Sequence, residues 1–194
     1  SVGAGVDIVT LGIGTDTISV GTTGSKDLIK VVAETSLVAN TAVITDWTTS
    51  AEIILTFAIV DGSSRNLVAL DDGAAATAAN SIAFAITGAY DLGAVALTDN
   101  STQLNLSTTV AYTSASQVET ALEYGGAFQL TNEGAKAAGD TWFVMYDDNV
   151  STYVAMVTVN SVVANGAYFG VGSLDATTLI KLTGIADNTT VVTG

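Results

Sequence analysis

The sequence predicts a mainly β protein, with a short parallel β-roll or solenoid segment at the N-terminus followed by an antiparallel β-sandwich that carries one short helix. Three observations predict this fold class. Short runs of Val, Ile, Thr, Leu and Phe are separated throughout by Gly, Asp, Asn and Ser, which is the pattern of strands and turns. A glycine and aspartate motif repeats at the start of the chain. Hydrophobic residues make up 48% of the 194 residues and charged residues only 12%, so the chain can bury a core.

The repeat lies in the opening residues. Residues 3–9 and 12–18 both follow the pattern G-x-G-x-D-x-U, in which U is a large aliphatic residue, and the two copies are offset by nine residues. A third copy is degenerate. Gly21 lies nine residues after Gly12, as the repeat requires, but the acidic residue, Asp27, and the aliphatic residue, Ile29, come later than in the first two copies. We expect residues 1–47 to form degenerate coils of a β-roll with an exit strand, and residues 48–194 to form the β-sandwich domain.

The spacing of this motif suits a calcium site. Glycines allow the tight turn that presents backbone carbonyls inward, and the aspartate adds a hard oxygen ligand of the kind that Ca²⁺ prefers. The aliphatic residue two positions further on is expected to point into the core. The alternative is that these are tight turns with solvated acids and no bound ion. The candidate calcium ligands are Gly3, Gly5, Asp7, Gly12, Gly14, Asp16, Gly24 and Asp27.

The motif resembles the nonapeptide of RTX proteins, the hemolysin-type calcium-binding family exported by type I secretion. The segment Val43-Ile44-Thr45-Asp46-Trp47 is similar to the stretch that often follows such repeats. The resemblance implies coils whose successive turns alternate between two sides, so that Asp7 faces Asp27, while Asp16 faces a turn before Ser1 or none. The rest of the chain is similar in texture to the C-terminal β domains of RTX-type surface proteins, including surface-layer proteins. The resemblance to RTX proteins implies an extracellular or cell-surface location.

The strands of the second domain are read from apolar runs between turn signals. Two of them, 142–146 and 153–159, are apolar on both faces and are expected at the centre of the sandwich, joined by a turn at Asp147-Asp148-Asn149. With no Pro in the chain, sheet edges must be protected by charges, bulges or a covering partner. The remaining predicted strands are 52–60, 67–70, 81–87 and 92–98.

Two further segments have a local signature. Leu104, Leu106 and Val110 fall at even spacing, so the other face of that strand is expected to be wet. The uncharged stretch between Asp148 and Asp175 is too polar for a membrane helix and is interpreted as two short strands around a turn at 165–166.

One short helix is predicted at residues 116–124. Ser116 and Glu119 have the spacing of a capping box, and an apolar stripe follows before two glycines. A second, Ala-rich candidate at 132–138 is interrupted by Gly134.

Composition excludes several functions. Five Lys and Arg against nineteen Asp and Glu give a net charge of −14, which disfavours nucleic acid because phosphates need basic residues. The absence of Cys and His excludes the usual zinc sites and Ser-His triads, and we expect no enzymatic activity. The acidic pair Asp147-Asp148 is interpreted as a solvated turn, and Trp47 and Trp142 as core anchors rather than a platform for sugars.

The function favoured by these observations is structural. We expect a subunit of a self-assembling extracellular surface layer, sheath or filament that Ca²⁺ stabilises, with other copies of the chain as its partners and no insertion into membranes. One alternative is an adhesin or carbohydrate-binding module that recognises a cell-surface glycan. Another is the non-catalytic secretion tail of a larger RTX exoprotein.

Overall fold

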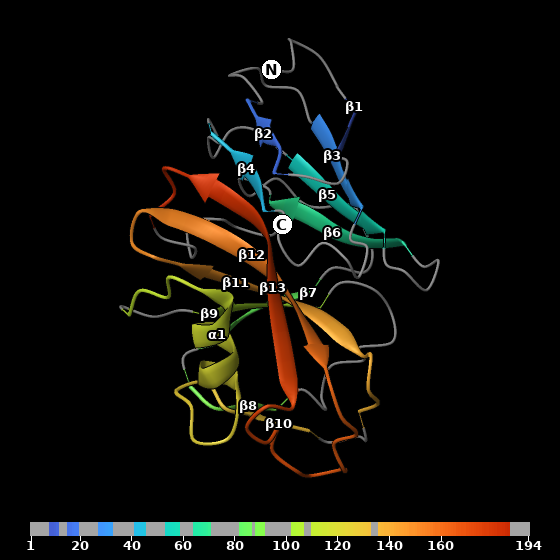
Figure 1. Cartoon of the computed structure of the whole chain (residues 1–194), viewed down its shortest axis with the longest axis vertical. Helices are drawn as coiled ribbons and strands as arrows, with labels where there is room; N and C mark the ends of the chain where they lie inside the picture. The colour runs from blue at the N-terminus through green and yellow to red at the C-terminus, as the bar shows by residue number, and fades with distance from the viewer. Residues whose placement is uncertain are drawn as a thin grey trace.

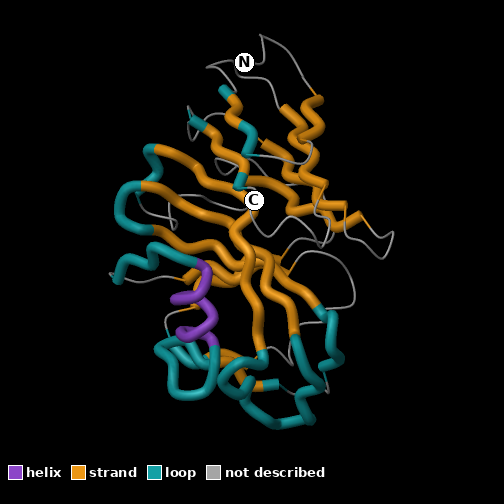
Figure 2. The backbone as a smooth tube through the Cα atoms, in the orientation of Figure 1, coloured by secondary structure: helices purple, strands orange, loops and turns teal. Residues whose placement is uncertain are grey.

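The computed structural model describes residues 8–11, 15–19, 27–32, 41–45, 53–58, 64–70, 82–86, 88–91, 102–106, 110–132 and 136–186. In this part of the chain the protein is mainly β with one short helix, which confirms the predicted fold class at that level (Figure 1, Figure 2). The helix is α1, Ala115–Leu122. The strands are β1 Ile8–Leu11, β2 Thr17–Ile18, β3 Asp27–Val32, β4 Ala42–Ile44, β5 Ile53–Ala58, β6 Ser64–Leu70, β7 Ile82–Ile86, β8 Tyr90–Asp91, β9 Thr102–Leu106, β10 Leu130–Thr131, β11 Thr141–Asp147, β12 Ser151–Val159 and β13 Leu174–Thr183.

These strands form three sheets. A four-stranded sheet has the order β1-β3-β5-β6, a seven-stranded sheet the order β2-β4-β13-β12-β11-β9-β7, and β8 pairs with β10. Five predicted strands are confirmed by β5, β6, β7, β11 and β12, while the one predicted at 92–98 lies outside the described residues. Strand pairs cross residue 47 in both larger sheets, β3 with β5 and β4 with β13. The division of the chain at that residue stays a prediction.

The seven-stranded sheet is mixed. Its centre is an antiparallel meander of β11, β12 and β13, but β2, β4, β7 and β9 join it by parallel pairing. The expectation of an antiparallel arrangement is therefore wrong outside the meander. Parallel neighbours are joined by long crossover connections, which the local turn signals of a sequence do not reveal.

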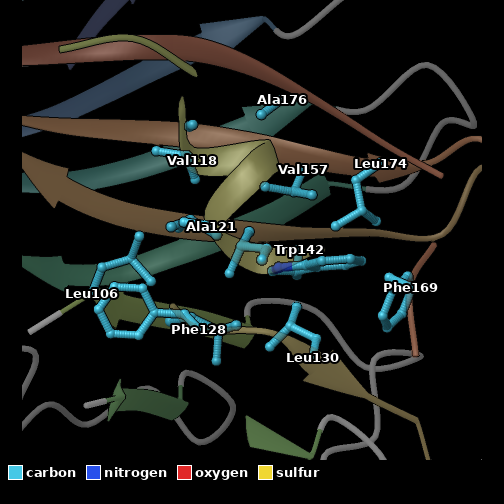
Figure 3. Packing of buried hydrophobic residues seen from close by; sticks show 14 of the residues in the cluster. Leu106, Val118, Ala121, Phe128, Leu130, Trp142, Val157, Phe169, Leu174 and Ala176 are labelled. Carbon is cyan, nitrogen blue, oxygen red and sulfur yellow. The ribbon is translucent and has the colours of Figure 1, made fainter. Parts of the chain in front are cut away.

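One face of the large sheet is closed by α1 and the loops near it (Figure 3). Trp142 is completely buried on β11, and its ring centroid lies 5.6 Å from that of Phe169. Val118 and Ala121 of α1 belong to the same cluster of buried residues. The interpretation of Trp142 as a core anchor is confirmed, and Trp47 lies outside the described residues. All seven residues of β11 are buried, as expected for a strand apolar on both faces.

The helix begins one residue earlier than predicted and has a different cap. Ser114 is the N-cap, and its side chain accepts a hydrogen bond from the Gln117 amide at 3.3 Å. Gln117 Oε1 accepts in turn from the Thr113 amide at 2.7 Å. The predicted capping pair of Ser116 and Glu119 is wrong, because the Glu119 carboxylate is held by a distant strand.

Two other local predictions are wrong. The described residues of the second helix candidate are not helical, because Lys136 forms an isolated antiparallel bridge with two backbone hydrogen bonds of 3.0 Å to Val163, and Ala138 lies in a turn. In β9, Leu104 and Leu106 are buried as predicted, but Asn105 between them is also only 8% exposed. The face that carries Asn105 is therefore covered at this position and not wet as predicted. Val110 is exposed and lies after the strand.

The turn predicted at residues 165–166 is present, and Gly166 has a φ of 76°, a value that glycine adopts without strain. The segments beside it are not the two expected strands. Between β12 and β13 the chain forms a long loop, in which Val163 and Tyr168 make only isolated bridges. No described helix is long and apolar enough to cross a membrane.

Candidate functional site

The strands at the glycine and aspartate repeats do not pair with the next strand along the chain. Each pairs with the strand after that one. β1 pairs in parallel with β3, and β3 with β5, while β2 pairs in parallel with β4. Two aliphatic residues of the motif are in register, because Val9 is the partner of Ile29, while Ile18 of the second copy is the partner of Ile44 in the segment that follows the repeats. Ile18 is only 6% exposed, as expected for the residue that points into the core.

Asp16 is the candidate ligand that the structure describes in most detail. It lies just before β2, and its carbonyl accepts a hydrogen bond of 2.8 Å from the Val43 amide. Its carboxylate Oδ2 is buried and has no hydrogen-bond partner within the described part of the chain. An orphaned buried carboxylate oxygen is costly, and a bound cation would satisfy it. The chemistry of Asp16 therefore fits a hard cation such as Ca²⁺.

Asp27 is the other candidate ligand whose backbone the structure describes. It is the first residue of β3 and pairs with Ile53 of β5. Asp16 thus directly precedes β2 of the seven-stranded sheet, whereas Asp27 begins β3 of the four-stranded sheet. The remaining candidate ligands lie outside the described residues: Gly3, Gly5, Asp7, Gly12, Gly14 and Gly24. Among the residues that the structure describes, no three Asp or Glu side chains gather in a group that could hold a metal ion.

The acidic pair at the turn between β11 and β12 is part of the turn's own hydrogen-bond network. Asp147 is only 3% exposed, so its interpretation as a solvated acid is wrong, and its Oδ1 accepts from the Asn149 amide at 3.1 Å. Asp148 Oδ1 accepts from the amides of Val150 at 2.9 Å and Ser151 at 2.7 Å. Asn149 has a φ of 64°, which Asn tolerates better than most residues. These two carboxylates stabilise the turn by accepting hydrogen bonds from its backbone amides.

The sheet register aligns two aromatic residues and a lysine beside this turn. Tyr146 of β11 is opposite Tyr153 of β12, which is opposite Lys181 of β13. The two rings stack with centroids 5.1 Å apart and planes 13° apart, and Lys181 Nζ lies 5.4 Å from the centroid of the Tyr153 ring. Tyr146 Oη and Thr178 Oγ1 form a 2.7 Å hydrogen bond. Sequence reasoning missed this cluster, because it depends on the register of three strands.

Tyr153 and Asp148 perturb each other's ionisation. Tyr153 Oη donates a 2.6 Å hydrogen bond to Asp148 Oδ2. Burial raises the pKa of Tyr153, and the hydrogen bond to Asp148 and the negative charge of that carboxylate raise it further. Burial alone would raise the pKa of Asp148, but the bond from Tyr153, the two amide bonds and the charge of Lys181 together lower it below its usual 3.8. The pair is therefore held as a neutral phenol and a carboxylate.

Two carboxylates of α1 bind backbone amides at the start of β13. Glu123 Oε1 accepts from Gly172 at 2.7 Å and from Leu174 at 3.2 Å, and Glu119 Oε1 accepts from Ala176 at 2.7 Å. Burial raises the pKa of Glu119, the Ala176 bond lowers it in part, and nearby carboxylates raise it. The sequence signal for this contact was the position of both acids beside the apolar stripe of the helix. These two acids join the helix and its C-cap to the start of β13.

Two surface hollows are lined by described residues. One, of about 370 Å³, lies beside α1 and includes Tyr112 and Gln117. The other, of about 300 Å³, lies in the loop between β12 and β13 and includes Tyr168 and Ser173. Neither described lining contains a charged side chain that could act as an acid or base. Comparison of the chain with protein-family models, curated proteins and solved structures finds no match.

Proposed function

We propose that this chain is a structural subunit of an extracellular assembly, such as a surface layer, sheath or filament, and that its first part is a calcium-stabilised β-roll. One observation carries the proposal: the alternate pairing of β1 with β3 and of β2 with β4. A roll in which successive turns lie on alternating sides requires this pairing, with the aliphatic residues of the motif in register. The pair Val9–Ile29 meets that requirement, and Ile18 of the second copy pairs with Ile44 of the segment that follows the repeats.

The register also supports a shared ion. In the sequence Asp7 directly precedes Ile8, as Asp27 directly precedes Leu28, and Ile8 and Leu28 are partners. Continuing that register by one residue would bring the two aspartates to equivalent positions of neighbouring turns. Their charges would repel in the absence of a cation, so Ca²⁺ would act both as a switch for folding and as a stabiliser of the folded roll. Such a switch suits a protein exported from a compartment of low calcium, in keeping with the resemblance to RTX proteins.

The use of the acids in the rest of the chain also supports a structural role. Glu119, Glu123 and Asp148 accept hydrogen bonds from backbone amides of other elements or turns. The chain has no His, the side chain most often used as a general base, and no Cys that could supply a thiolate nucleophile. The charged residues therefore serve the architecture of the fold.

Calcium titration of the melting temperature tests this proposal. A ligand at one hundred times its dissociation constant stabilises by about 2.7 kcal/mol, which for a domain of this size is about 5 to 10 °C. We expect this gain with Ca²⁺ and its loss with a chelator. Asp27→Asn should reduce the gain, whereas the matched control Asp175→Asn, at an exposed position of β13, should keep it. Electron micrographs should show polymers that disperse on chelation.

Unchanged melting and sedimentation in excess chelator would remove calcium from the proposed function. The absence of regular polymers in every condition would remove the structural role itself.

An adhesin is the second candidate, and one observation favours it. The rings of Tyr124 and Tyr168 are both exposed, and their centroids lie 5.0 Å apart. Exposed aromatic rings offer apolar faces on which sugar rings can stack. Glycan binding by a monomer that forms no polymers would favour this function over the structural one.

A further inference from the structure

Four exposed apolar residues gather at one end of the molecule. Tyr124 lies after α1, and Val162, Tyr168 and Val171 lie in the loop between β12 and β13, which is at the lower end of the molecule in Figure 1; we call these four residues the apolar end. Their exposed fractions are 62%, 74%, 44% and 85%. The three loop residues line the hollow of about 300 Å³, and the Tyr168 ring packs against that of Tyr124. Exposed apolar groups concentrated in this way often mark an interaction surface.

The apolar end is built on a loop that is firmly attached to the fold. Phe169, next to Tyr168, is completely buried against Trp142, and its carbonyl accepts a 2.8 Å hydrogen bond from the Tyr124 amide. Glu123 binds the amide of Gly172, next to Val171. The exposure of the apolar side chains therefore does not come from a loose loop. A surface held in place in this way loses little conformational entropy when it binds a partner.

The charge distribution indicates which partner fits. The chain has a net charge of −14, so most contacts between two copies bring carboxylates together. Residues 124–132 and 149–174, which carry the apolar end, contain no Asp, Glu, Lys or Arg. These two segments bring no charge of their own into a contact between two copies, and the neighbouring Glu123 carboxylate is already buried against the Gly172 amide. The polar side chains that line the hollow are Ser161, Tyr168 and Ser173, so the hollow offers hydroxyl groups but no charged group.

We propose that the apolar end is the surface through which a second copy of this chain binds. The proposal rests on the proposed function and names the contact that builds the assembly. The side chains of Val162 and Val171 are highly exposed, and residues of the same loop line a hollow. The valines of one copy can therefore enter the hollow of the other copy. Burial of these valines and of the two tyrosine rings drives the association.

Sedimentation velocity over a concentration series in millimolar Ca²⁺ tests this contact. We expect the wild-type chain to associate, and the double variant Val162→Asp/Val171→Asp to associate about 100-fold more weakly, because two buried valines are replaced by charges. The matched control is Val150→Asp, which makes the same change at a valine that is 66% exposed in the turn between β11 and β12. This control should associate like wild type. Melting curves confirm that each variant is folded, and Val171→Asp alone serves if the double variant is not.

The outcomes separate this proposal from the proposed function. Association of the double variant at wild-type strength would overturn the apolar end as the contact and leave the structural role intact. Equal weakening by Val150→Asp would also overturn it, because added charge at any surface position would then suffice. A wild-type chain that stays monomeric with and without Ca²⁺ would overturn both proposals. Glycan binding by a monomer, lost in the double variant, would assign the surface to an adhesin instead.

Discussion

At the scale of single residues, Tyr153 shows how one side chain connects three strands. Its ring lies between Tyr146 of β11 and Lys181 of β13, and its hydroxyl reaches Asp148 in the turn. The ring contributes stacking and a cation–π contact, and the hydroxyl contributes a charge-assisted hydrogen bond. The hydroxyl can therefore be removed while the ring stays in place.

Tyr153→Phe isolates that hydrogen bond. We expect the free energy of unfolding to fall by about 1 kcal/mol, below the usual range for a bond to a charged group because Asp148 is partly exposed to solvent. Urea unfolding at pH 7 measures the change. Tyr124→Phe is the matched control, since it removes a hydroxyl from an exposed tyrosine, and it should change stability by less than about 0.5 kcal/mol. Equal effects of the two variants would show that the bond to Asp148 contributes nothing.

At the scale of elements, α1 shows what local sequence can and cannot predict. Its apolar stripe of Val118, Ala121 and Leu122 is correctly predicted and is buried. Its cap is not, because both Ser114 and Ser116 are good capping residues followed three positions later by Gln or Glu. The choice is made by tertiary structure, since Glu119 lies where it can bind the Ala176 amide of β13.

Two serine variants test which residue caps the helix. Ser114→Ala should lower the free energy of unfolding by about 1 kcal/mol, because the Gln117 amide loses its acceptor. Ser116→Ala lies inside the helix and should have almost no effect, as Ala is the better helix former. Thermal unfolding of both variants and of wild type measures the difference. The reverse order would support the cap predicted from the sequence.

At the scale of the whole molecule, the strands could be predicted but their pairing could not. Apolar runs identify β11 and β12 because both faces of these strands are buried, and a short turn makes them neighbours. The parallel pairing of β4 with β13 joins segments far apart in the chain, and no turn signal reports it. For the same reason, the candidate calcium ligands could be named from their spacing, whereas the row of Tyr146, Tyr153 and Lys181 could not.

The alkaline limit of stability depends on tyrosines in several parts of this fold. Burial raises the pKa of Tyr112, Tyr146 and Tyr153 above the usual 10. The native state thus holds these protons more tightly than the unfolded state, so their contribution to stability is complete below pH 10 and is lost as the pH rises through the raised values. The loss is at most about 1.4 kcal/mol per pH unit for each tyrosine, and less for the partly exposed Tyr153.

Urea unfolding from pH 8 to pH 11.5 measures this dependence. Wild type should lose stability above pH 10, and Tyr153→Phe should lose less, because phenylalanine cannot ionise and the unfolded state no longer gains from releasing that proton. Parallel curves for wild type and Tyr153→Phe would mean that Tyr153 ionises equally in the folded and unfolded chains, contrary to its contact with Asp148.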